Sequence, residues 1–300
     1  MILGLSIYHI LWYFIEYAFI GWVIEVLYHA ICKGQIVNRG FLNGPICPIY
    51  GVGMIGVIAI TNVINSGLDE VGISSRSLRL LFIFLGGTLF ATAVELFAGW
   101  ILDKLFHARW WDYSDLPLNL GGYICLEFSM LWGMGILFVI EIVHPILAVE
   151  PTHGLITKTV GLIILAVFYS VFIADLISTV FTMVGINKKL SKIDEISRKI
   201  HGGSDYLTDK VGGGAFKATV KIQESAVQAS LAKAEIKDMT EEKLNDLYAR
   251  RNKLLEELTR NSHFGAGRLI RAFPYARHTR YQQAFKYLLE KAKTVHLKKQ

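Results

Sequence analysis

The sequence contains two copies of one spacing of chemically active side chains: an aromatic residue, a carboxylate and a histidine at positions i, i+3 and i+7. The copies are Trp22, Glu25 and His29, and Trp100, Asp103 and His107. On a helix this spacing forms one stripe, and a carboxylate four residues before a histidine can hold the imidazole in one tautomer. The stripes therefore predict sites that bind or relay protons or a small polar or cationic solute. Their recurrence favours this function over the alternative, an aromatic belt at the lipid headgroups.

Each stripe belongs to a longer internal repeat. The pattern that begins at Gly21 recurs from Gly99, 78 positions later, and its register continues without a gap to Cys47 and Cys125. Many membrane carriers place their site at the interface between two repeats. We therefore expect two helical hairpins, at about residues 8–64 and 86–147, with the functional site between them.

Five apolar stretches are long enough to cross a bilayer, which takes about 20 helical residues. They lie at residues 6–32, 46–64, 78–106, 123–147 and 156–186. Residues 1–186 carry 7 of the 31 Lys and Arg residues, and the remaining 24 follow residue 186. This asymmetry predicts an all-α, polytopic helical membrane protein with a transmembrane domain (1–186), a glycine-containing flexible linker (187–214) and a basic helical cytoplasmic domain (215–300).

The positive charges of the short connections predict the orientation. Seven of them lie around or after the ends of the first, third and fifth spans, and three lie on the other side. Because cytoplasmic loops carry an excess of Lys and Arg, we expect the N-terminus outside and the C-terminal tail in the cytoplasm. Both hairpins then start on the same side, which makes the repeats parallel.

Two further carboxylates, Glu95 and Asp175, fall inside predicted spans. An ionised carboxylate at mid-bilayer costs roughly 2.5–3.5 kcal/mol, so such residues usually face the bundle interior or a water-filled cavity. We expect them to add polar lining to the site. Asp175 lies beside a ladder of small residues, Ala166, Ser170, Ala174 and Ser178, which favours close helix packing and permits a homo-oligomer.

The loops after the first and third spans combine polar and aromatic residues with Gly and Pro, which interrupt helices. At membrane depth such backbone is tolerated only inside protein or along a cavity, so the loops are candidate binding elements. A plain cytoplasmic turn with interfacial tryptophans is the alternative. The candidate loop residues are Arg39 and Asn43 in the first loop, and Arg109, Trp110, Asp112, Tyr113 and Asn119 in the second.

Histidine and cysteine from each repeat are acceptable donors for a transition metal, namely His29 with Cys47 and His107 with Cys125. Their spacing matches no compact metal motif, and a small buried cysteine is the commoner role. We therefore predict no metal and no other cofactor. The chain also has no Walker A, Gly-x-Ser-x-Gly or His-Glu-x-x-His sequence, so we do not expect an enzyme.

The tail mixes cations with aromatics over residues 268–285. Such a surface docks on anionic lipid, on an acidic partner or on nucleic acid. Nearness to the bilayer favours lipid or protein over nucleic acid, and a solvated basic face is the plainest alternative.

The loop motifs resemble a known family. Arg109-Trp110-Trp111-Asp112-Tyr113-Ser114, with Pro117, Asn119, Gly122 and Cys125, and the earlier Gly40-Phe41-Leu42-Asn43-Gly44-Pro45 with Tyr50-Gly51 and Glu95, are similar to those of the ABC-transporter type IV permeases, bacterial membrane proteins. The resemblance covers about residues 8–180. It implies a bacterial plasma-membrane location and partnership with a separate ATP-binding subunit.

Together these features predict a permease-like integral membrane component of a transport system that moves or gates a small polar or cationic solute. Two alternatives remain. One is a membrane-anchored scaffold or regulator that acts through its basic tail, and the other is a membrane metal-binding protein.

Overall fold

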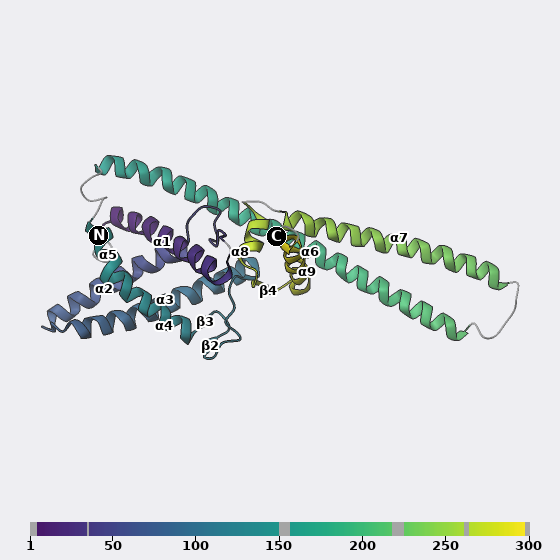
Figure 1. Ribbon diagram of the computed structural model, residues 1–300, viewed down its shortest axis with the longest axis horizontal. Coiled ribbons are helices and arrows are strands. Elements are labelled where there is room, and N and C mark those ends of the chain that lie inside the picture. Colours follow the sequence, from purple (N-terminus) through teal and green to yellow (C-terminus); the bar gives the residue numbers. More distant parts are fainter. Residues whose placement is uncertain (1–4, 35, 150–156, 218–224, 261–263, 298–300) are drawn as a thin grey trace. The chain divides into compact units, whose positions relative to one another are not determined.

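The computed structural model of the 300-residue chain describes residues 5–34, 36–149, 157–217, 225–260 and 264–297 (Figure 1). Most of them are helical and very few lie in strands, which confirms the all-α prediction. Five helices are long and apolar enough to cross a membrane, as expected. These candidate spans are Ile7–Cys32, Pro48–Glu70, Arg76–Phe106, Leu126–Ala148 and Lys158–His201.

The helices are α1 (Ile7–Lys33), α2 (Pro48–Glu70), α3 (Arg76–Phe106), α4 (Leu126–Phe138), the π-helix η1 (Val139–Val143), α5 (His144–Val149), α6 (Lys158–Lys217), α7 (Ser225–Thr259), α8 (Ala266–Ala272) and α9 (Gln282–Leu297). The four short strands are β1 (Ala108–Arg109), β2 (Asn119–Leu120), β3 (Ile124–Cys125) and β4 (Arg277–His278). Strand β1 pairs with β4 and β2 with β3, both antiparallel.

Local sequence accounts for the helix ends. Ser6 caps α1 by accepting a hydrogen bond from the backbone N–H of His9, and Gly34 closes the same helix in the left-handed conformation. Pro48 begins α2 at a position where its missing N–H costs nothing. His107 ends α3 with φ 52°, a conformation that non-glycine residues seldom adopt.

The chain divides into two compact units, which are described separately. The membrane unit comprises Met1–Met183 and His263–Thr279, and the tail unit comprises Val184–Ser262 and Arg280–Gln300. Helix α6 covers residues 187–214, where the glycines predicted a linker. The predicted domain boundaries stay a prediction.

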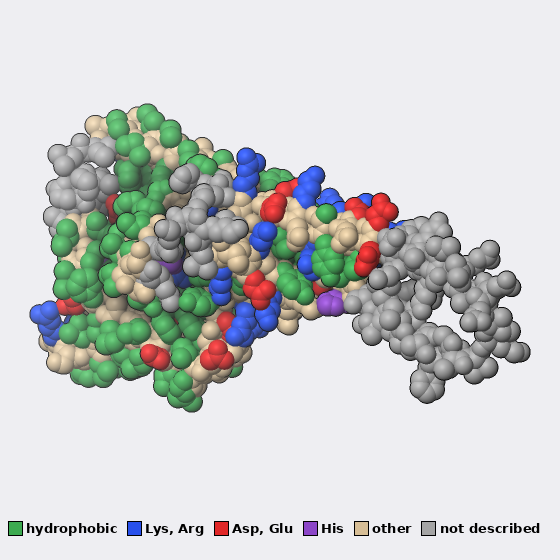
Figure 2. All heavy atoms as spheres, turned by 45° about the vertical axis from the view of Figure 1, so that its right-hand side comes forward, with side chains coloured by type: hydrophobic (Ala, Val, Ile, Leu, Met, Phe, Trp, Pro, Cys, Tyr) green, Lys and Arg blue, Asp and Glu red, His purple; other side chains and the backbone are tan. Residues whose placement is uncertain are grey.

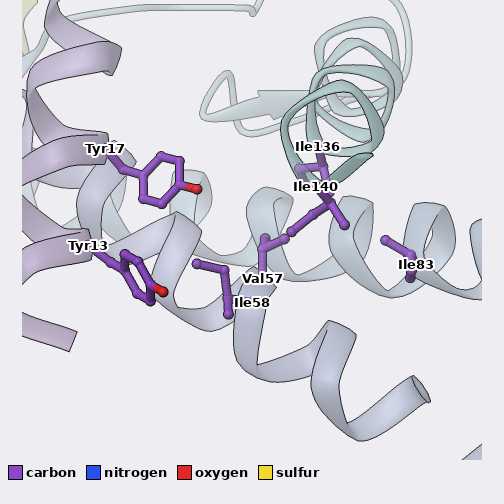
Figure 3. Packing of buried hydrophobic residues seen from close by; sticks show 7 residues of the cluster. All are labelled: Tyr13, Tyr17, Val57, Ile58, Ile83, Ile136 and Ile140. Carbon is purple, nitrogen blue, oxygen red and sulfur yellow. The ribbon is translucent and has the colours of Figure 1, made fainter. Parts of the chain in front are cut away.

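The core of the membrane unit lies among α1 to α4 and η1 (Figure 3). It contains Tyr13 and Tyr17 from α1, Val57 and Ile58 from α2, Ile83 from α3, Ile136 from α4 and Ile140 from η1. Large apolar side chains also point outward, among them Leu89 (74% exposed) and Phe181 (72% exposed), and hydrophobic surface dominates this unit in Figure 2. An apolar exterior around an apolar core is what a lipid-embedded bundle requires.

The tail unit is held by α7 and α9. The guanidinium of Arg251 lies 5.0 Å from the ring centroid of Tyr248 and 5.1 Å from that of Tyr287, so α7 and α9 meet around a cation between two aromatic rings. Leu255 and Leu258, which follow Arg251 on α7, are buried. Lys291 of α9 adds an ion pair, 3.3 Å, to Glu256.

Candidate functional site

Glu25 lies near the end of α1 and is held by two residues from outside that helix. The hydroxyl of Tyr50, in the first turn of α2, donates to Glu25 Oε1 at 2.9 Å. Arg39, from the loop between α1 and α2, lies 3.8 Å from Glu25 Oε2. A phenol and a guanidinium thus solvate and neutralise a carboxylate within a membrane span.

Gly21 makes this arrangement possible. A Cβ at position 21 would lie 2.2 Å from Cγ of Tyr50, so the Tyr50 ring occupies the place of a side chain on α1. Gly21 precedes Glu25 by four residues, or about one helical turn. The missing side chain therefore lets Tyr50 pack flat against α1, and its hydroxyl reaches the carboxylate one turn further along.

Glu95 of α3 is a buried carboxylate, only 6% exposed. Tyr113, from the loop after α3, donates its hydroxyl to Glu95 Oε1 at 3.0 Å. Trp132 of α4 donates its indole N–H to Oε2 at 3.2 Å. Both donors are neutral. Among the contacts of the described residues, Glu95 has no cationic partner, in contrast to Glu25.

The two carboxylates are linked across the bundle. The rings of Tyr50 and Trp132 meet edge to face, with centroids 5.5 Å apart. A chain of contacts therefore runs from Glu25 through Tyr50 and Trp132 to Glu95 and Tyr113, and we call these five residues the carboxylate network. They come from α1, α2, α3, α4 and the loop after α3. The network thus joins the α1–α2 hairpin to the α3–α4 hairpin.

Asp103 of α3 is bound like Glu25. Its Oδ2 accepts hydrogen bonds from the Tyr123 hydroxyl at 2.7 Å and from Arg109 Nε at 3.0 Å. The guanidinium of Arg109 also lies 4.4 Å from the Tyr123 ring centroid. Gly99 again lies four residues earlier, and a Cβ there would be 3.0 Å from Tyr123 Cδ1. Each carboxylate thus has a tyrosine packed on a glycine one turn away and an arginine from the following loop.

Asp175 of α6 fixes the loop after α1. Its Oδ1 accepts from the backbone N–H and the side-chain amide of Asn43, at 3.1 and 2.9 Å, and its Oδ2 accepts from the backbone N–H of Gly44 at 2.7 Å. In the same loop Leu42 is fully buried in a small cluster with Ala18 and Ile46. The carboxylate thus satisfies loop backbone, as buried N–H groups require.

The remaining predicted residues lie around these centres. His29 is buried, and His107 terminates α3. Trp110 packs on Phe41, with centroids 5.7 Å apart, and joins the two loops. Asn119 braces the second loop, because its side chain donates to the Leu116 carbonyl and accepts from the Gly122 N–H.

Asp112 also stabilises the second loop, because its Oδ1 accepts a hydrogen bond from the backbone N–H of Ser114 at 3.0 Å. Arg39 and Arg109 pair with the carboxylates described above.

The weak metal candidates give no assembled centre. Within the described parts of the chain, no three His, Cys, Asp or Glu side chains come together as a metal site. Cys47 and Cys125 are buried, and burial raises the pKa of the Cys47 thiol to about 12. A thiol in that state is a small apolar side chain rather than a ready ligand.

Sequence reasoning missed Tyr50 and Trp132 as site residues, together with Tyr123. Tyr50 was visible only as part of a loop motif. Which tyrosine packs on a given glycine depends on how segments distant in the sequence come together, and no local pattern predicts that.

Comparison with known proteins identifies a family. A family model described as "Putative ABC-transporter type IV" matches residues 12–180, more than half of the chain. No curated protein and no solved structure matches.

Proposed function

We propose a function from the premise that the chain belongs to the family described as "Putative ABC-transporter type IV". The protein is then the permease-like membrane component of a transport system. In this proposal the carboxylate network handles protons or a small polar or cationic solute. Family membership confirms the resemblance drawn from the loop motifs. The five apolar helices agree with a multi-pass membrane protein, whose first partner is the lipid bilayer.

The observation that carries the proposal is the link between Glu25 and Glu95. Two carboxylates from different hairpins are joined by aromatic donors inside the spans. A buried carboxylate that accepts only from neutral donors carries an uncompensated charge, which a proton or a bound cation would neutralise. Glu95 meets this description and is the residue that we assign to the exchange.

Asp103 and Glu25 have a second role in the proposal. Each is paired with an arginine from the loop that follows its helix, so neutralisation of either carboxylate would release that loop. Neutralisation of Glu25 would then change the first loop, and neutralisation of Asp103 would change the second. Asp175 would keep the first loop attached to α6 during such a change.

Several finer features belong to the same proposal. The two carboxylate–tyrosine–glycine arrangements support a parallel internal repeat. The charge asymmetry of the connections supports a cytoplasmic tail in a bacterial plasma membrane. Family membership supports a separate ATP-binding subunit, since the chain itself has no Walker A sequence.

Purification of the tagged full-length protein from native membranes in mild detergent tests this function. Mass spectrometry would identify co-purifying subunits, and an unrelated multi-pass protein with the same tag would serve as the control. The proposal expects an ATP-binding protein in a stoichiometric amount. Reproducible purification without one would remove the transport-component assignment.

A further inference from the structure

One part of the membrane unit comes from near the end of the chain. Residues 264–279, which we call the strap, contain α8 and β4 and lie against the loops that follow α1 and α3 (Figure 1). In the sequence the strap lies between α7 and α9. Leu269 is 1% exposed and Ala272 is fully buried. The strap is therefore packed as an integral part of the fold.

Arg268 attaches the strap to the first loop. Its Nη1 donates to the carbonyls of Gly40 at 2.7 Å and Asn38 at 3.2 Å, and its Nη2 donates to the carbonyl of Phe41 at 2.9 Å. Burial lowers the pKa of the Arg268 guanidinium to about 10, an effect that nearby Asp175 opposes. Arg268 is thus charged at neutral pH, and its charge is satisfied by loop backbone.

The strap is attached to the second loop by different contacts. Strand β4 pairs with β1, so that His278 lies opposite Ala108 and Arg277 opposite Arg109. Arg277 Nη1 also lies 2.9 Å from Oδ2 of Asp112, whose side chain is 7% exposed. The ring of Phe273 packs on Trp110 with centroids 4.6 Å apart. Main-chain pairing, an ion pair and an aromatic contact thus hold this end.

The end of the strap also reaches a carboxylate of the proposed site region. The Thr279 hydroxyl donates to Asp103 Oδ1 at 2.8 Å, while its backbone N–H donates to the His107 carbonyl at 2.8 Å. Asp103 is therefore bound by Tyr123 and Arg109 on one oxygen and by the strap on the other.

We propose that the strap is a coupling element that, together with the direct packing of Trp110 on Phe41, holds the two loops as one body. Because the strap contacts both loops and Asp103, a displacement of the strap would then act on all of them at the same time. The use of this coupling in transport rests on the proposed function, because a transport component needs a route from cytoplasmic events to its membrane site. The coupling of the two loops follows from the contacts alone and is tested without a transport measurement.

Hydrogen–deuterium exchange on the full-length protein in lipid nanodiscs, read by mass spectrometry, tests the coupling. The first variant, Arg268→Ala, removes the hydrogen bonds of the guanidinium to the first loop. The second, Thr279→Val, removes the hydrogen bond of the hydroxyl to Asp103 of α3. Arg250→Ala, which alters an exposed ion pair on α7, is the matched control. We expect exchange in residues 38–44 and in residues 107–113 to rise roughly tenfold in both strap variants and to stay unchanged in the control.

Each result has a definite meaning. Faster exchange of both loops in either strap variant supports a single coupled body. Faster exchange confined to the loop that lost its contact overturns the proposal, since the strap would then be two independent attachments. If Arg268→Ala does not fold, Arg268→Lys keeps the charge but loses the fork of donors, and the same comparison applies. Failure to recover an ATP-binding subunit would leave this result untouched, so the two proposals fail separately.

Discussion

The ring of Tyr50 fills the space that a side chain at position 21 would occupy, with Cγ of Tyr50 only 2.2 Å from an ideal Cβ on Gly21. This relationship sets the distance between α1 and α2 and places the Tyr50 hydroxyl on Glu25. The carboxylate network depends on it, because Tyr50 is the residue that joins Glu25 to Trp132.

Gly21→Ala should therefore be destabilising. The new methyl group must displace the Tyr50 ring, and overpacking of this kind costs about 1–3 kcal/mol. Gly53→Ala in α2 is the matched control, because a Cβ there would meet no atom within 4 Å. Unfolding of the purified variants in detergent micelles measures both. Equal stability of the two variants would show that Tyr50 does not require Gly21.

Tyr113→Phe should weaken the fold through Glu95. The substitution removes one of two donors from a buried carboxylate, which costs about 1–3 kcal/mol in the free energy of unfolding. In a Glu95→Gln background the loss should be smaller by about 1 kcal/mol, because an amide tolerates a missing donor better than a carboxylate. A double-mutant cycle from detergent unfolding gives this coupling. Strictly additive effects would exclude the hydrogen bond as the link.

Asp175→Asn should loosen the loop after α1. An asparagine keeps the shape but replaces one acceptor oxygen with an N–H₂ group, which would face a donor of Asn43 or Gly44. We expect a loss of about 1–3 kcal/mol and faster limited proteolysis of residues 38–44. The exposed Glu127→Gln serves as the control. Unchanged cleavage of the loop in Asp175→Asn would contradict the anchoring role.

The three cysteines should differ in their reaction with a maleimide. Cys32 is exposed, and the other two are buried. Burial holds the pKa of Cys47 at about 12, so its reactive thiolate is scarce at pH 8 and increases only as the pH rises toward 12. Single-cysteine variants labelled between pH 7 and pH 9 should show fast modification of Cys32 alone. Equally fast labelling of Cys47 would mean that the loop and helix around it open freely.

The sequence was sufficient to predict the membrane spans but not the residues that bind the carboxylates. Five long apolar stretches predict five helices because hydrophobicity and length are local properties. The expected partner of Asp103 was His107, one turn away. The structure gives Asp103 an arginine, a tyrosine and a threonine from other elements, while His107 ends the helix. Local spacing shows which side chains share a face but not which ones arrive from elsewhere.

The strap shows the same limit more sharply. Arg268 lies in a segment whose composition is equally typical of a solvated basic face. The acceptor at the shortest distance, the Gly40 carbonyl, is 228 residues away in the sequence. Burial of this arginine depends on three loop carbonyls that converge only after folding. Trp132 is similar, because an indole in an apolar helix is as typical of a lipid-facing belt as of a donor to a buried carboxylate.

The most direct test of the central claim is the ATPase activity of the complex recovered from native membranes and placed in lipid nanodiscs. The comparison is between wild type, the Glu25→Gln/Glu95→Gln double variant and the Glu127→Gln control. We predict that an ATP-binding subunit co-purifies with all three, and that its activity falls roughly tenfold in the double variant alone, as expected for loss of a coupling of about 1.4 kcal/mol. Equal activity in the double variant and the wild type would contradict a role for the carboxylate network in transport.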